Sequence, residues 1–267
     1  MVRPIKLVLS DVDGTLVTSD KTLTPATLEA VASLREAGVL FAITSARPPR
    51  GLVAFVEPLH LVTPLGAFNG ATMILPNLRV LEEKLIDDES ALATLEVLED
   101  FGLAPWVYTG AHWYVRDAAS AHVHHESQSC QCEPEPLDHL ASVTTGVSKM
   151  VGVSDDEAAS AGAARALNDR FGHRVSVSRS QSYFLDVTHP DANKGNVVRF
   201  LAQHYDIATD EIATIGDMHN DVSMFEVSGL SIAMGNALAE VQSAANYVTS
   251  SNNDEGFARA ITEHVLA

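Results

Sequence analysis

The chain has 267 residues, of which 46% are hydrophobic, so it can bury a substantial core and is not an intrinsically disordered chain. Its 35 acidic and 17 basic side chains give a formal net charge of −18, which argues against nucleic acid or an anionic membrane as the main partner. No apolar run approaches the roughly 18 residues that a membrane-spanning helix needs.

The N-terminus and the cysteines bear on the compartment. Met1 to Pro4 lead directly into an apolar run, which leaves no room for a signal peptide. Cys130 and Cys132 are too few for a disulfide framework. These features predict a cytoplasmic protein, and nothing in the sequence indicates its oligomeric state.

The first predicted strand covers residues 5–10 and runs directly into Asp11-Val12-Asp13-Gly14-Thr15. Ligands of open α/β sheets bind at the carboxyl ends of the strands, where these two aspartates lie. Alternation places Asp11 and Asp13 on one side. Together they offer hard oxygen ligands suited to Mg²⁺, and one nucleophile and one acid/base. The alternative is a polar strand end with ordinary turn residues.

The next elements continue a strand and helix alternation. Thr24 as N-cap and Pro25 as first helical residue predict a helix that ends at Gly38. A second strand over 39–44 leads into Ser45-Ala46-Arg47-Pro48-Pro49, and a helix follows. We expect a third strand near 65–69, after which Gly70 opens a hairpin with its second arm at 79–81.

The regular alternation stops in the middle of the chain. A loop is expected around residues 122–136, which hold several histidines and Pro134 and Pro136. The other expected elements are helices near 90–101 and 156–171 and strands near 106–108, 113–115, 149–153, 175–177 and 183–187. This mixture predicts an inserted α+β domain over 83–188, between core segments 1–82 and 189–267.

Alternation returns after residue 189. Lys194 lies in the first turn of a predicted helix, where a cation opposes the helix dipole, so its charge is expected to have another purpose. A strand over 212–215 runs into Gly216-Asp217-Met218-His219-Asn220-Asp221, and further strands follow over 230–234 and 247–249, before a last helix from Gly256. Helix capping would explain only one of these acids.

Together the elements predict an α/β fold, with a doubly wound, Rossmann-like parallel-sheet core and the inserted α+β domain. The acidic pair after the first strand, Ser45, Lys194 and the second acidic motif all fall at strand ends or at a helix start. In this order the motifs resemble the haloacid dehalogenase superfamily. Within it the chain looks like a Cof-type member of subfamily IIB with a C2B cap inserted behind the third strand. The further matches are Phe68-Asn69-Gly70-Ala71, Asp191-Ala192-Asn193-Lys194-Gly195, Ala233-Met234-Gly235-Asn236-Ala237 and Ser251 to Gly256.

The resemblance implies an aspartyl-phosphate mechanism. Asp11 would be the nucleophile, and Asp13 would protonate the leaving alkoxide and then activate water. The expected Mg²⁺ ligands are Asp11, Asp13 through its backbone carbonyl, Asp217 and Asp221. Ser45 and Lys194 are the other expected catalytic residues. The expected phosphate- and substrate-binding residues are Gly14, Thr44, Ala46, Arg47, Asn69, Gly70 and Asn220.

The second motif departs from the family pattern, because Ser45-Ala46-Arg47 stands where members usually have Thr-Gly-Arg. Ser45 keeps the hydroxyl, and Thr44 ranks second for this role. In the cap, the residues that could contact substrate are His112, Trp113, Tyr114, Arg116, His122, His124, His125, Arg179 and Tyr183.

The histidines and cysteines of 122–132 superficially suggest zinc, but Cys-x-Cys places the thiols closer than structural zinc sites usually do, and a solvated loop is the favoured reading. The expected function is a Mg²⁺-dependent phosphatase acting on a small phosphorylated metabolite, most often a sugar phosphate. The alternatives are a phosphotransferase of the phosphomannomutase type and a phosphate-binding protein without turnover. The sequence leaves the substrate open among sugar phosphates, pyridoxal phosphate, flavin-pathway phosphates and phosphoglycolate.

Overall fold

The computed structural model describes residues 4–110, 112–130 and 132–267, which form two compact units. Unit 1 contains the chain up to Ala46, Leu52–Leu81 and Asn193–Ala267. Unit 2 contains Glu82–Ala192 together with the short segment Arg47–Gly51. The insertion predicted over 83–188 thus falls inside unit 2. No helix of the described residues is long and apolar enough to cross a membrane.

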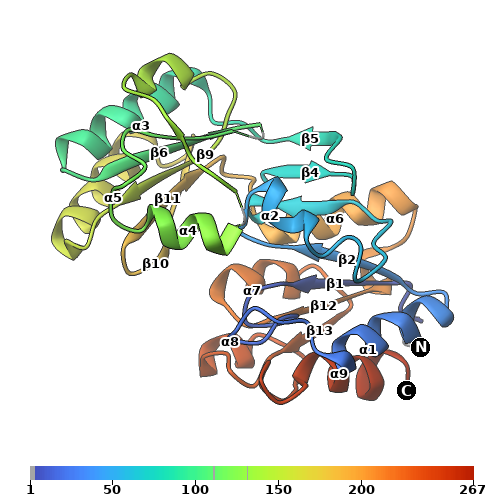
Figure 1. Ribbon diagram of the computed structural model, residues 1–267. Coiled ribbons are helices and arrows are strands. Elements are labelled where there is room, and N and C mark those ends of the chain that lie inside the picture. Colours follow the sequence, from blue (N-terminus) through green and yellow to red (C-terminus); the bar gives the residue numbers. More distant parts are fainter. Residues whose placement is uncertain (1–3, 111, 131) are drawn as a thin grey trace. The chain divides into compact units, whose positions relative to one another are not determined.

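Unit 1 is built on an eight-stranded sheet with the order β14-β13-β12-β1-β2-β3-β4-β5 (Figure 1). The strands from β14 to β3 are parallel, whereas β4 is antiparallel to β3. The strands are β1 (Leu7–Asp11), β2 (Leu40–Thr44), β3 (Leu65–Ala67), β4 (Thr72–Ile74), β5 (Val80–Glu83), β12 (Ile212–Gly216), β13 (Leu230–Ala233) and β14 (Tyr247–Val248). The first strand in the chain is therefore central, and its neighbours β2 and β12 come from opposite ends of the sequence.

Helices cover both faces of this sheet, because successive strand residues alternate between two apolar clusters. Val8 and Ile43 face a cluster that includes residues of α1 and α9, while Leu7 and Ala42 face one that includes residues of α6 and α7. The helices of unit 1 are α1 (Pro25–Glu36), α6 (Lys194–Tyr205), α7 (His219–Phe225), α8 (Ala239–Ser243) and α9 (Gly256–Ala260). Helix α2 (Pro49–Val53) begins in the Arg47–Gly51 segment of unit 2 and ends in unit 1. The predicted doubly wound α/β class is confirmed.

The predicted hairpin after the third strand is wrong in detail. The chain reverses at once through Phe68 and Asn69, with φ of +50° and +56°, and Gly70, with φ of +94°. Strand β4 follows and pairs with β3, so that Leu65 lies opposite Ile74. The expected arm at 79–81 is instead part of β5, the next strand of the sheet. The three residues of β4 are too few to show a period of two in the sequence.

Unit 2 has a six-stranded sheet with the order β10-β11-β9-β6-β7-β8. Its strands are β6 (Ala104–Thr109), β7 (His112–Val115), β8 (Glu135–Pro136), β9 (Val147–Val153), β10 (Ser176–Gln181) and β11 (Phe184–Thr188). Helices α3 (Asp88–Asp100) and α5 (Glu157–Phe171) pack on one face, where Val107, Met150 and Leu185 point into a shared apolar cluster with them (Figure 1). The predicted α+β character agrees with this arrangement.

The expected loop over 122–136 contains a helix, α4 (Val123–Cys130). Val123, Ser127 and Cys130 are its buried residues, and their spacing of four and three residues marks one helical face. Cys130 and Cys132 form a disulfide that closes a very short loop at the end of α4. The loop prediction failed because the polar residues of the other face, such as His124 and His125, hide this narrow apolar stripe in the sequence.

Candidate active site

Three aspartates of unit 1 converge at the carboxyl ends of two neighbouring strands. Asp11 is the last residue of β1, and Asp217 follows the last residue of β12. Asp221 lies in the first turn of α7. Because β1 and β12 are adjacent and parallel, one carboxylate oxygen from each of the three lies within 4.8 Å of the others. The predicted convergence of Asp11 and Asp217 is thus present in the described structure.

Lys194 neutralises part of this charge. As the first residue of α6, it sends its Nζ atom 2.5 Å from Asp11 Oδ1 and 2.5 Å from Asp221 Oδ1. Its side chain is 1% exposed. Burial lowers the pKa of Lys194, but the two aspartates outweigh it and raise the pKa above its ordinary value. Acids from other elements therefore stabilise the Lys194 cation, although the helix dipole disfavours a positive charge at the N-terminus of α6.

The site keeps a surplus of negative charge after the pairing with Lys194. Three carboxylates and one ammonium leave a formal charge of −2 in a buried space. Burial raises the pKa of Asp11 most strongly, Lys194 lowers it, and Asp221 and Asp217 raise it further. Burial, followed by Asp221, raises the pKa of Asp217 to about 6. Carboxylate oxygens that repel one another in this way fit a hard divalent ion, so the residues present suit Mg²⁺.

Asp217 is oriented by two groups that the sequence analysis did not assign to the site. Thr15 Oγ1 donates to Asp217 Oδ1 at 3.0 Å, and Asn236 Nδ2 donates to Oδ2 at 3.2 Å and to the Gly14 carbonyl at 3.0 Å. A Cβ atom on Gly14 would lie 2.4 Å from Asp217 Oδ2. Glycine is therefore needed at position 14 for two reasons: the backbone lies too close to Asp217 for a side chain, and its φ of +83° favours glycine. Thr15 and Asn236 both lie inside motifs that carried the family resemblance, so this resemblance was the sequence signal that could have identified them.

Asp221 combines two tasks. Its Oδ2 atom accepts hydrogen bonds from the backbone N–H groups of Asp217 and Met218, each at 2.9 Å. Its Oδ1 atom accepts from Lys194. Capping of α7 and placement of the acidic cluster are thus carried by one carboxylate, in agreement with the expectation that capping explains only one of the acids.

Asp13 lies apart from the group that could hold a metal. Its Oδ1 atom pairs with Lys21 Nζ at 2.6 Å, and its side chain is 30% exposed. Among the described residues, the cluster with metal-ligating geometry consists of Asp11, Asp217 and Asp221. Asp13 was expected to act as an acid/base through its side chain and to bind metal through its carbonyl, and both roles stay predictions.

The two hydroxyl candidates at the end of β2 differ in their surroundings. Thr44 Oγ1 donates to the Gly66 carbonyl at 3.1 Å and is fully buried in the sheet. Ser45 is also buried, and its backbone N–H donates to Gly66 O at 2.9 Å while its carbonyl accepts from Asn69 N at 2.8 Å. The hydroxyl of Thr44 therefore has a structural use, and the role of Ser45 as the phosphate contact stays a prediction.

Other predicted binding residues fall into two groups. Asn220 Nδ2 donates to Asn69 Oδ1 at 3.0 Å, so the loop after β3 and helix α7 meet within unit 1. Gly70 follows Asn69 in the same turn, and Ala46 is the last residue of its unit 1 segment. Arg47 belongs to unit 2, is buried, and has its Nη1 atom 3.4 Å from the Gly51 carbonyl.

The candidate residues of unit 2 are partly engaged in local contacts. His122 stacks on Tyr183 with ring centroids 3.8 Å apart, and its Nε2 atom lies 2.9 Å from Asp155 Oδ1. His112 Nδ1 lies 2.7 Å from Glu135 Oε1. Among the described residues, the group whose geometry could hold a metal includes none of the histidines and cysteines of 122–132. Cys130 and Cys132 are joined to each other in a disulfide.

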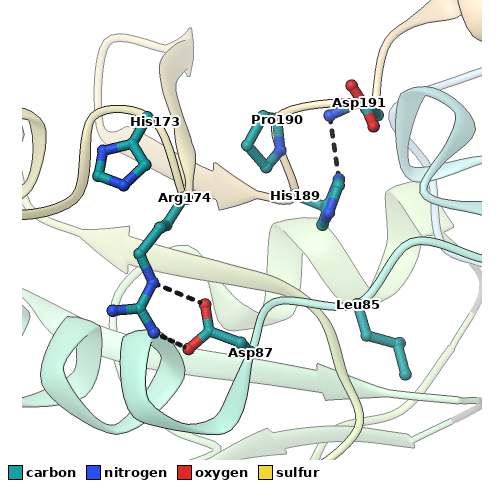
Figure 2. A pocket seen from close by; sticks show the side chains of 7 residues that line it. All are labelled: Leu85, Asp87, His173, Arg174, His189, Pro190 and Asp191. Atoms are coloured by element: carbon teal, nitrogen blue, oxygen red, sulfur yellow. Dashed lines mark hydrogen bonds and ion pairs between the residues drawn. The ribbon is translucent and has the colours of Figure 1, made fainter.

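A separate pocket of about 350 Å³ lies in unit 2, and its walls come from residues just after β5 and just after β11 (Figure 2). Arg174 makes hydrogen bonds to Asp87 across it, and His189 Nδ1 accepts from the Asp191 backbone N–H at 3.0 Å. The other lining residues are Leu85, His173 and Pro190. None of its residues was predicted as a site residue, and its charged groups already pair with one another.

Comparisons with known proteins agree with this geometry. A family model described as haloacid dehalogenase-like hydrolase matches residues 8–261. A relative from Haemophilus influenzae, whose phosphatase name is provisional, is 34% identical over 259 residues, covering 97% of each chain. A 5-amino-6-(5-phospho-D-ribitylamino)uracil phosphatase of Bacillus subtilis is 28% identical, covering 97% of this chain and 98% of its own.

Solved structures extend the agreement to the whole fold. A haloacid dehalogenase-like hydrolase from Bacteroides thetaiotaomicron superposes with a TM-score of 0.89 at 27% identity, covering 97% of this chain and 98% of its own. The family match spans most of the chain and includes every residue of the acidic cluster. The chain therefore belongs to the haloacid dehalogenase-like hydrolase family and is an enzyme of the phosphoric monoester hydrolase type.

Proposed function

We propose that this enzyme is a Mg²⁺-dependent phosphatase that hydrolyses a small phosphorylated metabolite through an aspartyl-phosphate intermediate. The observation that carries the proposal is the buried group of Asp11, Asp217 and Asp221 with Lys194 at 2.5 Å from two of them. Such a group positions a nucleophile and compensates the charge of a phosphoryl group, which is what phosphoryl transfer mainly requires.

Asp11 supplies the nucleophile. Lys194 holds Asp11 Oδ1, so Oδ2 is the oxygen that would attack phosphorus. A P–O bond forms to this oxygen while the P–O bond to the organic group breaks, and the leaving oxygen takes a proton. Water then attacks the phosphorus of the acyl phosphate, the bond to Asp11 breaks, and inorganic phosphate leaves with the carboxylate restored.

Asp13 is the proposed proton carrier for both steps. It follows Asp11 by two residues and is partly exposed, so its carboxyl group can exchange protons with water. It would give its proton to the leaving oxygen and later take one from the attacking water. Its pairing with Lys21 in the described structure would have to be released for this role.

Asp11, Asp217 and Asp221 would hold Mg²⁺, with Thr15 and Asn236 fixing the orientation of Asp217. When bound, the ion offsets the negative charge of the phosphoryl group and acts as a Lewis acid on it. Lys194 and Ser45 would contact phosphoryl oxygens, and one divalent ion would balance the formal charge of −2 of the three carboxylates and Lys194.

For the substrate we propose a sugar phosphate or a related polyhydroxylated ester, in keeping with the ribityl phosphate named for the Bacillus subtilis relative. The test is a phosphate-release screen over some dozens of metabolites with and without Mg²⁺, including Asp11→Asn as the inactive control. Release of free phosphate that needs Mg²⁺ and Asp11 supports the proposal. Transfer of phosphate within a sugar, or binding without release, would contradict it.

A further inference from the structure

Both carboxylate oxygens of Asp217 accept hydrogen bonds from side chains that lie far from it in the sequence. Thr15 Oγ1 donates to Oδ1 at 3.0 Å, and Asn236 Nδ2 donates to Oδ2 at 3.2 Å. An aspartate bonded through both oxygens cannot rotate without losing one of these bonds, so the two donors set the direction in which its lone pairs point. The orientation of Asp217 therefore depends on how firmly Thr15 and Asn236 are held.

Thr15 lies in a tight turn that directly follows β1. The backbone N–H groups of Leu16 and Val17 both donate to the Val12 carbonyl, at 2.9 and 3.1 Å. The turn ends at the Val17 carbonyl, which accepts a hydrogen bond from Asn252 Nδ2 at 2.9 Å. The side chain of Asn252 therefore holds the end of the turn that presents the Thr15 hydroxyl to Asp217.

Asn236 is held by the backbone of the same residue. Its Oδ1 atom accepts a hydrogen bond from Asn252 N–H at 2.9 Å, while its Nδ2 atom bonds to Asp217 and to the Gly14 carbonyl. An asparagine amide has an acceptor at one end and donors at the other, so a donor at its oxygen fixes which end faces Asp217. If the amide were reversed, its oxygen would face the carboxylate and repel it.

The segments that carry Asn236 and Asn252 are in close contact. Gly235 N–H donates to the Ser250 carbonyl at 3.0 Å, and a Cβ atom on Gly235 would lie 2.8 Å from the carbonyl carbon of Ser250. On the other side, Gln242 Nε2 donates to the Gly235 carbonyl at 3.2 Å. Asn252 itself is only 8% exposed. A displacement of Asn252 would therefore be transmitted to Asn236.

We propose that Asn252 is a positioning residue of the Mg²⁺ site, which fixes Asp217 by holding both of its side-chain donors. Its side chain restrains the turn that carries Thr15, and its backbone N–H restrains Asn236. Removal of a group that orients a metal ligand commonly weakens metal binding by about 10- to 100-fold. This inference rests on the proposed function, and it extends the metal site to a residue that contacts none of the three carboxylates.

The test measures binding of Mg²⁺ alone to the full chain, through the rise in unfolding temperature as Mg²⁺ is added to metal-free protein. The variants are Asn252→Ala and Asn252→Leu. Leucine is close to asparagine in size but has no donor, so destabilisation by a cavity would not affect the second variant. The matched control is Asn253→Ala in the same loop, because Asn253 is exposed and bonds instead to the N–H and Oγ of Ser19, at 3.0 Å each.

We expect both Asn252 variants to raise the dissociation constant of Mg²⁺ by about 10-fold, because Asp217 loses its fixed orientation. Asn253→Ala should change this constant by less than about 2-fold, since its side chain contacts neither donor of Asp217. A merely structural role for Asn252 would lower the unfolding temperature of the metal-free protein and leave the dissociation constant unchanged. That result in the folded variants would overturn the inference.

A second background tests whether Asn252 acts through the two donors. In Thr15→Val/Asn236→Ala neither donor remains, so the addition of Asn252→Leu should weaken Mg²⁺ binding by less than about 2-fold further. A further loss of about 10-fold in this background would contradict the route through Thr15 and Asn236.

Phosphate release separates this inference from the proposed reaction. With the best substrate of the screen, the Asn252 variants should need about 10-fold more Mg²⁺ for half-maximal rate, while kcat at saturating Mg²⁺ stays within about 3-fold of the wild type. If no ester releases phosphate but Mg²⁺ binding weakens in these variants, the proposed function fails and the assignment of Asn252 stands. If phosphate release needs Mg²⁺ and the variants bind the ion as the wild type does, the assignment fails and the function stands.

Discussion

Among the described residues, one lysine is fully buried in unit 1 and another nearly so in unit 2, and their partners differ. Lys194 lies between two of three clustered carboxylates, which leaves a surplus of negative charge. Lys149 pairs with one carboxylate, that of Asp186, so this ion pair has no surplus charge. The first arrangement keeps a formal charge of −2, whereas the ion pair of the second is formally neutral. The two buried lysines therefore differ in the charge balance of the groups that they contact.

The comparison is tested most strongly at the nucleophile. Asp11→Asn should reduce phosphate release by at least about 10⁴-fold, because no other group at this position can form the acyl phosphate. Mg²⁺ should still bind, though weakly, through Asp217 and Asp221. The measurement is kcat on the best substrate found in the screen. Asp20→Asn, an exposed acid nearby in sequence, is the control, and an Asp11→Asn enzyme within 10-fold of the wild type would refute the assignment.

The second test exchanges the two lysines for methionine. Lys194→Met leaves three carboxylates with no cation, so it should lower the free energy of unfolding by about 3–5 kcal/mol at pH 7. Lys149→Met leaves a single carboxylate without its cation, so its loss of unfolding free energy should be smaller. Urea unfolding without metal measures both. Lys194→Met should remain the more destabilising of the two variants when the pH is lowered. The difference between their losses of unfolding free energy should shrink as the aspartates of unit 1 become protonated. An equal loss in both variants would contradict the comparison.

The third test removes one negative charge from the acidic cluster, at Asp217. The pKa of Asp217 is raised to about 6 in the folded protein, above its ordinary value of 3.8, so the folded state binds this proton more tightly than the unfolded state. This group therefore lowers the stability of the metal-free protein as the pH rises from about 4 to 6. Asp217→Asn should flatten that decline and make the metal-free protein more stable at pH 7.

Added Mg²⁺ provides the opposite arm of this experiment. Mg²⁺ should stabilise the wild type by an amount that rises with the logarithm of its concentration above the dissociation constant, and it should have little effect on Asp217→Asn. Thermal unfolding in EDTA and in Mg²⁺ measures both effects. A variant that is less stable than the wild type at pH 7 without metal would show that Asp217 is not repelled by its neighbours.

The smallest expected loss of stability concerns an exposed ion pair, whose contribution serves as the reference for that of the buried ion pairs. Asp87 caps α3 by accepting from Ser90 N at 3.0 Å and also pairs with Arg174. Asp156 caps α5 without an arginine, through Ala158 N at 2.8 Å. Each Asp→Ala change should cost about 1 kcal/mol, and the two costs should differ by less than about 1 kcal/mol because exposed pairs contribute little. A much larger cost at Asp87 would overturn this ranking.

The core of unit 1 was predictable because its signals are local and repeated. Long apolar strands such as β1 and β12, and the N-cap Thr24 with Pro25, are visible in short stretches of sequence. The convergence of Asp11, Asp217 and Lys194 followed from the topology of a parallel sheet, together with the family resemblance. Strand order alone did not give the contacts of Asp13, whose pairing with Lys21 depends on the path of one exposed turn.

Other features required contacts between distant residues. Thr15 and Asn236 meet at Asp217 although 221 positions separate them, so only the family motifs around these two residues, and no local pattern, could have indicated their contact. The short strand β4 and the helix α4 were missed because their periodicity extends over too few residues. Lys149 was predicted only as part of a strand, since its burial depends on a strand that has partners on both sides.

The central position of β1 also has a consequence for synthesis of the protein. Its partner β2 is made within 40 residues, but its other partner, β12, begins at Ile212, and Asn252 must still arrive to bond the Asn236 that orients Asp217. Unit 2 is almost complete by residue 192. Every residue of the inserted unit is therefore synthesised before the cluster around Asp11 can close, and a chain that ends near residue 210 would contain the whole insertion but lack β12, Asp217 and Asp221.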